Sequence, residues 1–236
     1  MGRIALHGNP PIDVDLRRSS RARRISLRLS GLDGRVTLTL PRRVPEAEGL
    51  AFLREKEAWL RRHLADRAPE VRVGLGATLP VEGRAHRIET GPGRSVRQGD
   101  GVLLVPGAER QVPARLSAWL KARARDRLAA ASDRHAAALG RRYGQLALRD
   151  TRSRWGSCSS EGRLMYSWRL ILAPPEVLDY VAAHEVAHLV EMNHSRAFWA
   201  LVDRLCGDWQ DQRDWLRREG GRLHAYRFEA APAEDD

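Results

Sequence analysis

Residues 177–194 have the sequence VLDYVAAHEVAHLVEMNH, which decides more about the fold and the chemistry than any other stretch. His184 and His188 are four residues apart, so a helix would place both imidazoles on one face. Glu185 follows the first histidine and is rotated by about one residue around the same helix. This H-E-x-x-H pattern is typical of metalloproteases. It predicts a metal site on a helix, with His184 and His188 as ligands and Glu185 as the catalytic residue.

The residue types at this site suit zinc-dependent hydrolysis. Two neutral imidazoles bind Zn2+ at about 2.0–2.1 Å, and the ion lowers the pKa of a bound water to about 7. A nearby carboxylate accepts the proton of that water as it attacks a carbonyl, and then passes the proton to the leaving amine. So short a pattern also arises by chance, but the flanking residues are apolar, and polar side chains are expensive to bury there without partners. The expected cofactor is therefore Zn2+ and the expected activity is hydrolysis.

A third ligand is expected beyond the end of the helix. His194 follows His188 by six residues, just past the expected helix end at residues 192–193. A turn there would return His194 to the metal and leave one coordination position open for water. The metzincin pattern has the same histidine spacing but a glycine where this chain has Glu191, so Asn193, which tolerates a left-handed conformation, is the expected turn residue. The alternative third ligands are Glu191 and Glu219.

Composition indicates a globular protein of one large domain or two small ones. The chain has 236 residues, of which 42% are hydrophobic and 30% are charged. The N-terminus lacks the basic start and apolar stretch of a secretory signal, and charged or histidine residues interrupt the most apolar stretch, residues 170–192. We therefore expect a cytoplasmic location and no membrane partner. Cys158 and Cys206 are expected to be reduced thiols, because a domain of this size needs no disulfide.

The formal net charge of +11 makes nucleic acid a candidate partner. Arginines cluster between Arg17 and Arg28 and could bind phosphates, although arginines on the outer face of a hairpin are usually only solvated. Lys56 and Lys121 are the only lysines, and such an excess of arginine also occurs in proteins from G+C-rich genomes. Charge therefore predicts an encounter with nucleic acid but does not predict a function.

The hydrophobic pattern indicates an α+β fold with a β-rich N-terminal region. Alternating apolar residues predict strands between residues 14 and 40 with a hairpin turn at 31–34, and proline with acidic residues opens a helix over 45–65. Further expected elements are short strands over 77–105, a helix over 113–142, a strand over 164–171, a helix from 174 through both histidines, and a helix over 195–206. The predicted domains are 1–107, β-rich with one helix; 108–228, which carries the chemistry; and 229–236, an acidic tail.

Further motifs surround the metal pattern. They are Arg154-Trp155-Gly156-Ser157-Cys158-Ser159-Ser160, Tyr166-Ser167-Trp168-Arg169-Leu170, Ala173-Pro174, Tyr180-Val181-x-x-His184-Glu185-x-x-His188-Leu189 and Asn193-His194-Ser195-x-x-Phe198-Trp199. Together they resemble the YgjP-like metallopeptidase family, which is related to the SprT-like and WLM metalloproteases. The resemblance implies a zincin-like C-terminal domain in which His184, His188 and His194 hold zinc, Glu185 is the base, and the substrate is a protein or peptide. Its SprT and WLM relatives act on proteins bound to DNA.

Other residues are candidates for supporting roles. The strand over 164–171 is expected either to border the cleft and pair with an extended substrate or to belong to the sheet core. The predicted substrate-binding residues are Arg154, Trp155, Tyr166 and Trp168, and Ser157 is a further candidate for lining the cleft. Asp203 or Asp208 could orient the ligand histidines, and His224 or Tyr226 could stabilise a developing oxyanion. Cys158 is not expected to be a nucleophile, because no base accompanies it.

The sequence leaves three functional hypotheses open. The first is a zinc-dependent peptidase in which water is the nucleophile. The second is a DNA-associated protease, or a nucleic-acid-binding module, whose arginine-rich surface recruits protein substrates. The third is a zinc-stabilised domain without catalysis, and both Glu185 and the expected open coordination position argue against it, since structural zinc sites usually have four protein ligands.

Overall fold

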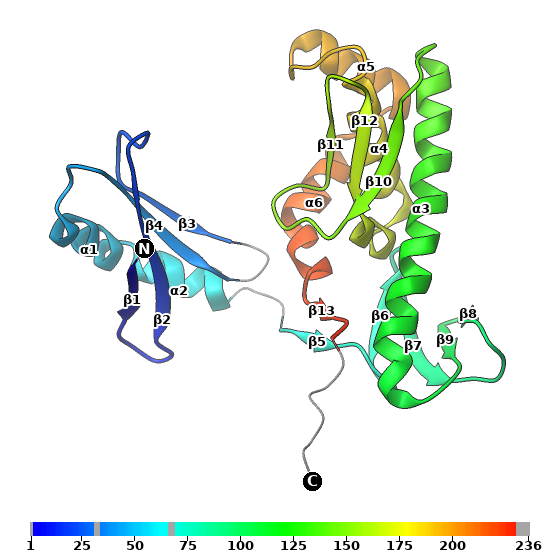
Figure 1. Ribbon diagram of the computed structural model, residues 1–236, viewed down its shortest axis with the longest axis horizontal. Helices are drawn as coiled ribbons and strands as arrows, with labels where there is room; N and C mark the ends of the chain where they lie inside the picture. Colours follow the sequence, from blue (N-terminus) through cyan, green and yellow to red (C-terminus); the bar gives the residue numbers. More distant parts are fainter. Residues whose placement is uncertain (1, 31–33, 66–68, 230–236) are drawn as a thin grey trace. The chain divides into compact units, whose positions relative to one another are not determined.

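The computed structural model describes residues 2–30, 34–65 and 69–229, which divide into two compact units (Figure 1). The first unit is Met1–Pro69 and the second is Glu70–Asp236. The fold is mixed α+β, with a β-rich N-terminal part and a C-terminal part in which helices surround the metal pattern, as the sequence predicts. Among the described helices, none is both long and apolar enough to cross a membrane.

The described part of the first unit packs a sheet of four strands against two helices. Its elements are β1 (Gly2–Leu6), β2 (Ile12–Ser19), β3 (Ser26–Leu29), β4 (Val36–Pro41), α1 (Glu46–Glu55) and α2 (Glu57–Ala65), and the strand order is β1-β2-β4-β3. Alternate residues of β2 and β4 are buried, so that Val14, Leu38 and Leu40 share a core with Leu53 and Leu60.

Two predictions for the first unit have different outcomes. The predicted hairpin is confirmed, because β3 and β4 pair in antiparallel fashion. Residues 31–33 of its predicted turn lie outside the described residues. The helix predicted over 45–65 is interrupted, since α1 ends at Glu55 and α2 begins at Glu57.

The second unit contains the metal pattern. Its strands are β5 (Val71–Arg72), β6 (Thr78–Val81), β7 (Arg84–Thr90), β8 (Arg97–Gln98), β9 (Val102–Val105), β10 (Gln145–Arg149), β11 (Gly156–Cys158), β12 (Arg163–Ser167) and β13 (Tyr226–Arg227). Its helices are η1 (Glu109–Gln111), α3 (Val112–Ala138), η2 (Trp168–Leu172), α4 (Pro175–Ala187), α5 (Arg196–Cys206) and α6 (Gln210–Leu223). The strand orders are β6-β7-β9-β8, β10-β12-β11 and β13-β5. Helix α3 runs along the unit and contacts both β9 and β10 (Figure 1).

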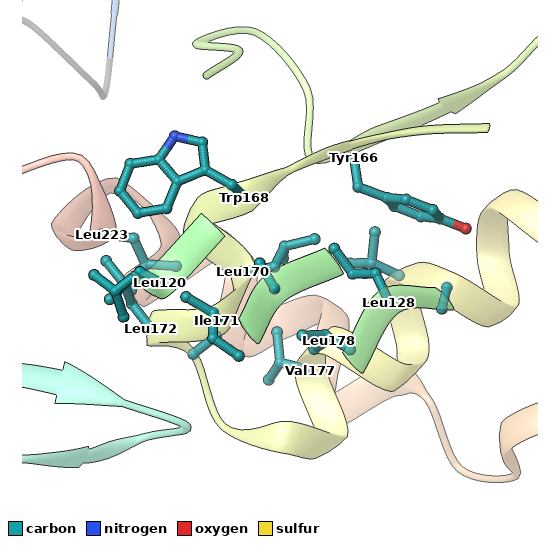
Figure 2. Close-up of a cluster of buried hydrophobic side chains, with 14 of the residues drawn as sticks. Leu120, Leu128, Tyr166, Trp168, Leu170, Ile171, Leu172, Val177, Leu178 and Leu223 are labelled. Carbon is teal, nitrogen blue, oxygen red and sulfur yellow. The ribbon is translucent and has the colours of Figure 1, made fainter. Parts of the chain in front are cut away.

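The hydrophobic core of the second unit lies where α3, η2 and α4 meet. Leu120 and Leu128 of α3 pack with Leu170 and Ile171 of η2 and with Val177 of α4 (Figure 2). Each of these side chains is buried, and their packing joins the helix that carries the histidines to the longest helix of the unit. The core therefore gives α4 a rigid support.

The compact units divide the chain at a different place from the predicted domain boundary. Strands β6, β7 and β9 bury Leu79, Ile88 and Leu103 in the same hydrophobic cluster as α3 and α4. Residues 70–107 therefore pack with the second unit, although the sequence changes character only near residue 107. The acidic tail predicted over 229–236 lies outside the described residues except for Glu229. The functional boundaries at 107 and 228 stay predictions.

The strand predicted over 164–171 is shorter than expected and lies in the middle of its sheet. β12 ends at Ser167, and residues 168–172 form the buried 3₁₀ helix η2. β10 pairs with one side of β12 in parallel fashion, and β11 pairs with the other side in antiparallel fashion. The idea that this strand pairs with an extended substrate is therefore wrong, because its neighbours already occupy both hydrogen-bonding edges. The alternative, a place in the sheet core, is confirmed.

The guanidinium group of Arg169 connects the C-terminal end of α6 to the end of β10. The side chain donates hydrogen bonds to Asp150 Oδ1 at 2.7 Å and to the carbonyl oxygens of Leu223 and Tyr226, each at 3.0 Å. It also lies over Trp168, 4.9 Å from the ring centroid. Burial alone would raise the pKa of Asp150, but the hydrogen bond and charge of Arg169 outweigh it and hold that pKa below its usual value. This network fixes the end of α6, a helix that the sequence analysis did not predict.

Candidate metal centre

Helix α4 presents His184 and His188 from an almost completely buried segment. Pro175 occupies the first turn of the helix. Backbone N–H groups in that turn have no partner within the helix, so proline, which lacks an N–H, is tolerated there. Most of the other side chains are buried, because α3, α5, α6 and β11 all contact the helix. A helix that neighbours cover on most of its sides is mostly apolar, which explains why this one has few exposed polar residues. Its fixed position determines where the two imidazoles lie.

The helix ends earlier than the sequence analysis expected, at Ala187 rather than at residues 192–193. His188 is its C-cap, and the N–H of Glu191 donates to the carbonyl of Ala187 at 3.0 Å. His188 Nδ1 lies 2.9 Å from the carbonyl oxygen of Glu191, which accepts its N–H. That hydrogen bond fixes the tautomer of His188 and leaves the lone pair on Nε2 free for a metal.

The turn that returns His194 to the helix does not use the expected left-handed residue. In the described chain Glu82 is the single non-glycine residue with a positive φ in the left-handed region, so the expectation for Asn193 is wrong. The side-chain oxygen of Asn193 instead accepts a hydrogen bond from the N–H of Ser195 at 3.0 Å. Ser195 Oγ then caps α5 by accepting from the N–H of Phe198 at 3.3 Å. The hydrogen bonds accepted by the side chains of Asn193 and Ser195 therefore stabilise this turn in place of a residue in the left-handed conformation.

The three histidines converge on one point. Single ring nitrogens of His184, His188 and His194 all lie within 4.8 Å of one another. The Nε2 atoms of His184 and His194 are 3.1 Å apart. Two nitrogen ligands of one tetrahedral zinc ion, each at 2.0–2.1 Å, would be about 3.3 Å apart. The three residues therefore fit a divalent ion that histidine binds, and zinc is such an ion.

Helix α5 supports the three imidazoles with aromatic rings. Phe198 is fully buried and stacks on His188 with a centroid separation of 4.5 Å. The edge of Phe198 faces His194 at 4.8 Å, and Trp199 stacks on His194 at 5.8 Å. These contacts limit the rotation of rings that would otherwise be mobile, particularly that of the exposed His194. A metal site requires such orientation of its ligands.

Burial favours the neutral form of His184 and of His188. It lowers the pKa of His184 to about 4, and the charges of His188 and His194 add to the effect. Burial also lowers the pKa of His188, despite the hydrogen bond to Glu191. Neutral imidazole is the form that binds a metal ion. The Nδ1 atom of His184 is buried and has no hydrogen-bond partner among the described residues.

Glu185 lies against the backbone of the edge strand β11. Its residue is only 6% exposed, and burial raises the pKa of its carboxyl to about 8, an effect that the charge of Arg154 opposes. Gly156 makes this approach possible, because a Cβ there would lie 2.5 Å from both Cγ and Oε1 of Glu185. The glycine at position 156 of this motif thus has a steric explanation that the sequence alone does not show.

A cavity of about 340 Å³ opens beside His184 and Glu185. Its lining comes from three segments: Tyr180, Val181, His184 and Glu185 of α4; Arg154, Trp155 and Gly156 at the start of β11; and Arg213, Leu216 and Arg217 of α6. The residues of α6 were not among the candidates predicted from the sequence. A spacing of four residues between the two arginines was the available signal, but it does not indicate which helix they face. This volume is within the range of small-molecule and peptide side-chain pockets.

The residues predicted to bind substrate separate into two pairs. Arg154 and Trp155 line the cavity. Tyr166 and Trp168 do not, because Tyr166 is 0% exposed and Trp168 is 2% exposed, and both belong to the buried hydrophobic cluster (Figure 2). The hydroxyl of Tyr166 forms a 3.0 Å hydrogen bond with Ser132 Oγ. The prediction for Tyr166 and Trp168 is therefore corrected to a packing role.

The remaining candidates contribute no side chain to the cavity lining or to the histidine cluster. Among the described residues, Asp203 and Asp208 make no hydrogen bond to those rings, and a backbone carbonyl orients His188 instead. His224 packs on Trp155 with a centroid separation of 5.1 Å, and neither it nor Tyr226 lines the cavity. Ser157 and Glu191 are also absent from the cavity lining and from the histidine cluster, and Glu219 pairs with Arg222 at 2.8 Å.

The two cysteines are free thiols, as expected. Burial raises the pKa of Cys158 to about 11, and the nearby charge of Glu185 adds to the rise. A thiol with such a pKa is almost entirely protonated at neutral pH and is a poor nucleophile. This agrees with the expectation that Cys158 does not attack the substrate.

Comparison with known proteins identifies the class and then the family. Residues 23–219 match the family model of the YgjP-like metallopeptidase domain. The chain is thus a metallopeptidase by class, and it belongs to the YgjP-like family. No curated protein matches the chain. No solved structure matches it either.

Proposed function

We propose that this protein is a zinc-dependent peptidase in which His184, His188 and His194 hold the ion and Glu185 is the general base. The observation that carries the proposal is the convergence of three ring nitrogens within 4.8 Å of one another, next to a buried carboxyl group and a cavity. Membership of a metallopeptidase family supports a metal ion and a protein substrate. To what family membership supports, the proposal adds zinc as the ion, the three histidines as its ligands and Glu185 as the base.

The chemistry divides between the ion and the side chains. When bound, zinc supplies a water of lowered pKa and polarises the substrate carbonyl. Glu185 accepts a proton at its carboxylate oxygen and returns it to the nitrogen of the leaving amine. The neutral rings of His184 and His188 keep their lone pairs for the ion, since burial lowers the pKa of both. Trp155 and Leu216 contribute apolar surface to the cavity.

A zinc-stabilised domain without catalysis is a weaker alternative. Structural zinc sites usually have four protein ligands. Within the described residues the cluster has three histidines, and a cavity opens beside them. A nucleic-acid partner has the net charge of +11 as its support, and the cytoplasmic location rests on composition, so both stay predictions.

Three substitutions on α4 test the proposed roles. His184→Ala is expected to lose zinc and turnover of denatured casein, because it removes one ligand. Glu185→Gln is expected to keep zinc but lose turnover, because an amide cannot accept the proton. Glu176→Gln is the matched control, since Glu176 is an exposed acid in the first turn of the same helix. Wild-type turnover by Glu185→Gln would remove the base assignment, and full zinc content in His184→Ala would remove the ligand assignment.

A further inference from the structure

The cavity beside the histidines contains three guanidinium groups. Arg213 and Arg217 line it from α6, and Arg154 lines it from the segment before β11. Of the described lining residues, Glu185 is the one with a carboxyl group. Positive charge therefore exceeds negative charge in a cavity where a substrate would lie. An excess of this kind favours an anionic group on the substrate.

Arg213 packs on aromatic rings, and its ion pair with Asp214 is long. Its guanidinium group lies 4.7 Å from the ring centroid of Trp209 and 5.8 Å from that of Trp199. The two indoles stack on each other at 4.3 Å with an interplanar angle of 20°. Stacking occupies the face of a guanidinium group and leaves its in-plane N–H donors available. Its Nε is buried without a hydrogen-bond partner in the described chain, since Asp214 Oδ1 is 3.9 Å away.

The other two arginines are also available to a ligand. Arg217 forms an ion pair with Asp214 at 3.2 Å, but its side chain is 66% exposed, so this contact is weak. The side chain of Arg154 forms no hydrogen bond or ion pair within the described residues, and its charge acts on Glu185. Arg154 lines the same cavity as His184 and Glu185, so a group that binds Arg154 there lies close to the proposed base.

We propose that this cavity binds a carboxylate of the peptide substrate, so that the enzyme prefers an acidic residue beside the scissile bond. The proposal rests on the proposed function and names the substrate class of that same site. A guanidinium group binds a carboxylate through two parallel N–H donors, a geometry that neither an amide nor an ammonium group matches. The shared chemistry is a carboxylate, and its source is either an acidic side chain or the free C-terminus of a peptide.

The size and the apolar lining of the cavity agree with an acidic side chain. The volume of about 340 Å³ is at the lower end of the range for ligand pockets, large enough for one or two residues. Trp155 and Leu216 offer apolar contacts for the methylene groups of glutamate. The arginines offer donors to its carboxylate. A longer polyanion would need contacts outside this cavity.

Binding of short peptides tests this proposal without requiring turnover. The peptides are three N-acetylated pentapeptides: Ala-Ala-Glu-Ala-Ala as the C-terminal amide, the same amide with Gln in the centre, and the Gln peptide with a free C-terminal carboxylate. Titration calorimetry would measure their affinities for the zinc-loaded Glu185→Gln protein, in which cleavage is not expected. The same titrations use this protein with Arg154→Gln or Arg217→Gln added, and Arg218→Gln serves as the control, because Arg218 is an exposed residue of α6 that does not line the cavity.

The peptide amide with Glu in the centre is expected to bind about tenfold more tightly than the one with Gln, because it gains one charge-assisted hydrogen bond. This preference is expected to fall in the Arg154→Gln and Arg217→Gln proteins while their zinc content and melting temperature stay unchanged, and to persist in Arg218→Gln. A preference shown only by the free C-terminus would assign the carboxylate to a chain end and would overturn the preference for an acidic residue. Equal binding of all three peptides, or no binding of either carboxylate peptide, overturns the proposal.

A carboxylate that binds the metal ion gives a different result. In that case the preference survives both arginine substitutions and disappears when a chelator removes the zinc, which also overturns the proposal. The outcome is independent of the proposed function, because binding is measured apart from cleavage. Wild-type protein without any turnover would remove the proposed function, but the arginine-dependent preference would remain measurable.

Discussion

Replacement of Gly156 by alanine tests whether Glu185 must lie against strand β11 for turnover. A Cβ at this position would lie 2.5 Å from Cγ and 2.5 Å from Oε1 of Glu185. Non-bonded carbon atoms prefer separations of about 3.5–4.0 Å, so the carboxyl group has to move by roughly 1 Å. A displacement of about 1 Å at a reacting group can lower the rate by about 10²-fold. We therefore expect kcat/KM of Gly156→Ala to fall by about 100-fold while its zinc content stays close to that of the wild type.

The same crowding affects stability by a smaller amount. Overpacking of a close-packed site costs about 1–3 kcal/mol, and the free energy of unfolding is expected to fall by that amount. Rates on denatured casein, zinc content and urea unfolding separate the three effects. Gly144→Ala is the matched control, because its Cβ would lie 3.8 Å from the nearest atom, the carbonyl oxygen of Glu161. Wild-type kcat/KM in Gly156→Ala would refute the argument that this glycine positions Glu185.

Two other substitutions have expected outcomes. Arg169→Met removes the hydrogen bonds to Asp150 and two carbonyls, so urea unfolding should show a loss of about 3 kcal/mol, whereas Arg218→Met on the surface should change little. The folded pKa of Asp150 lies below its usual 3.8, so the stabilisation by this pair is complete above that value and is lost as the pH falls through the folded pKa. A difference between wild type and Arg169→Met that stays constant below pH 3.8 would contradict this pairing. Cys158→Ser is expected to keep its zinc and its turnover, because burial raises the pKa of the thiol to about 11, and a large loss of rate would reopen its role.

The sequence predicted the parts of the site that lie close together along the chain. His184, Glu185 and His188 belong to one helix, whose period places them together without any knowledge of the rest of the fold. His194 was within reach because only six residues separate it from His188. The turn between them was predicted incorrectly, since side-chain caps by Asn193 and Ser195 replace the left-handed residue.

The parts that depend on tertiary packing could not be predicted. Strand periodicity gives the face of a side chain but not the order of strands, so the central place of β12 and the burial of Tyr166 were missed. Helix α6 is rich in charged residues and buries few of its own, and therefore its sequence resembles a solvated segment. The end of α6 is fixed by Arg169 of η2, a contact between different elements that the sequence does not indicate. Trp209, the N-cap of α6, packs on Arg213 from one turn earlier in the same helix.

The zinc content of purified protein tests the central claim most directly. Elemental mass spectrometry would compare the wild type, His194→Ala and the control His63→Ala at equal protein concentration; His63 is exposed and lies in the first unit. The account predicts about one zinc ion per chain in the wild type and in His63→Ala, and a large loss in His194→Ala. Wild-type zinc content in His194→Ala, or no zinc in the wild type after zinc is supplied, would contradict it.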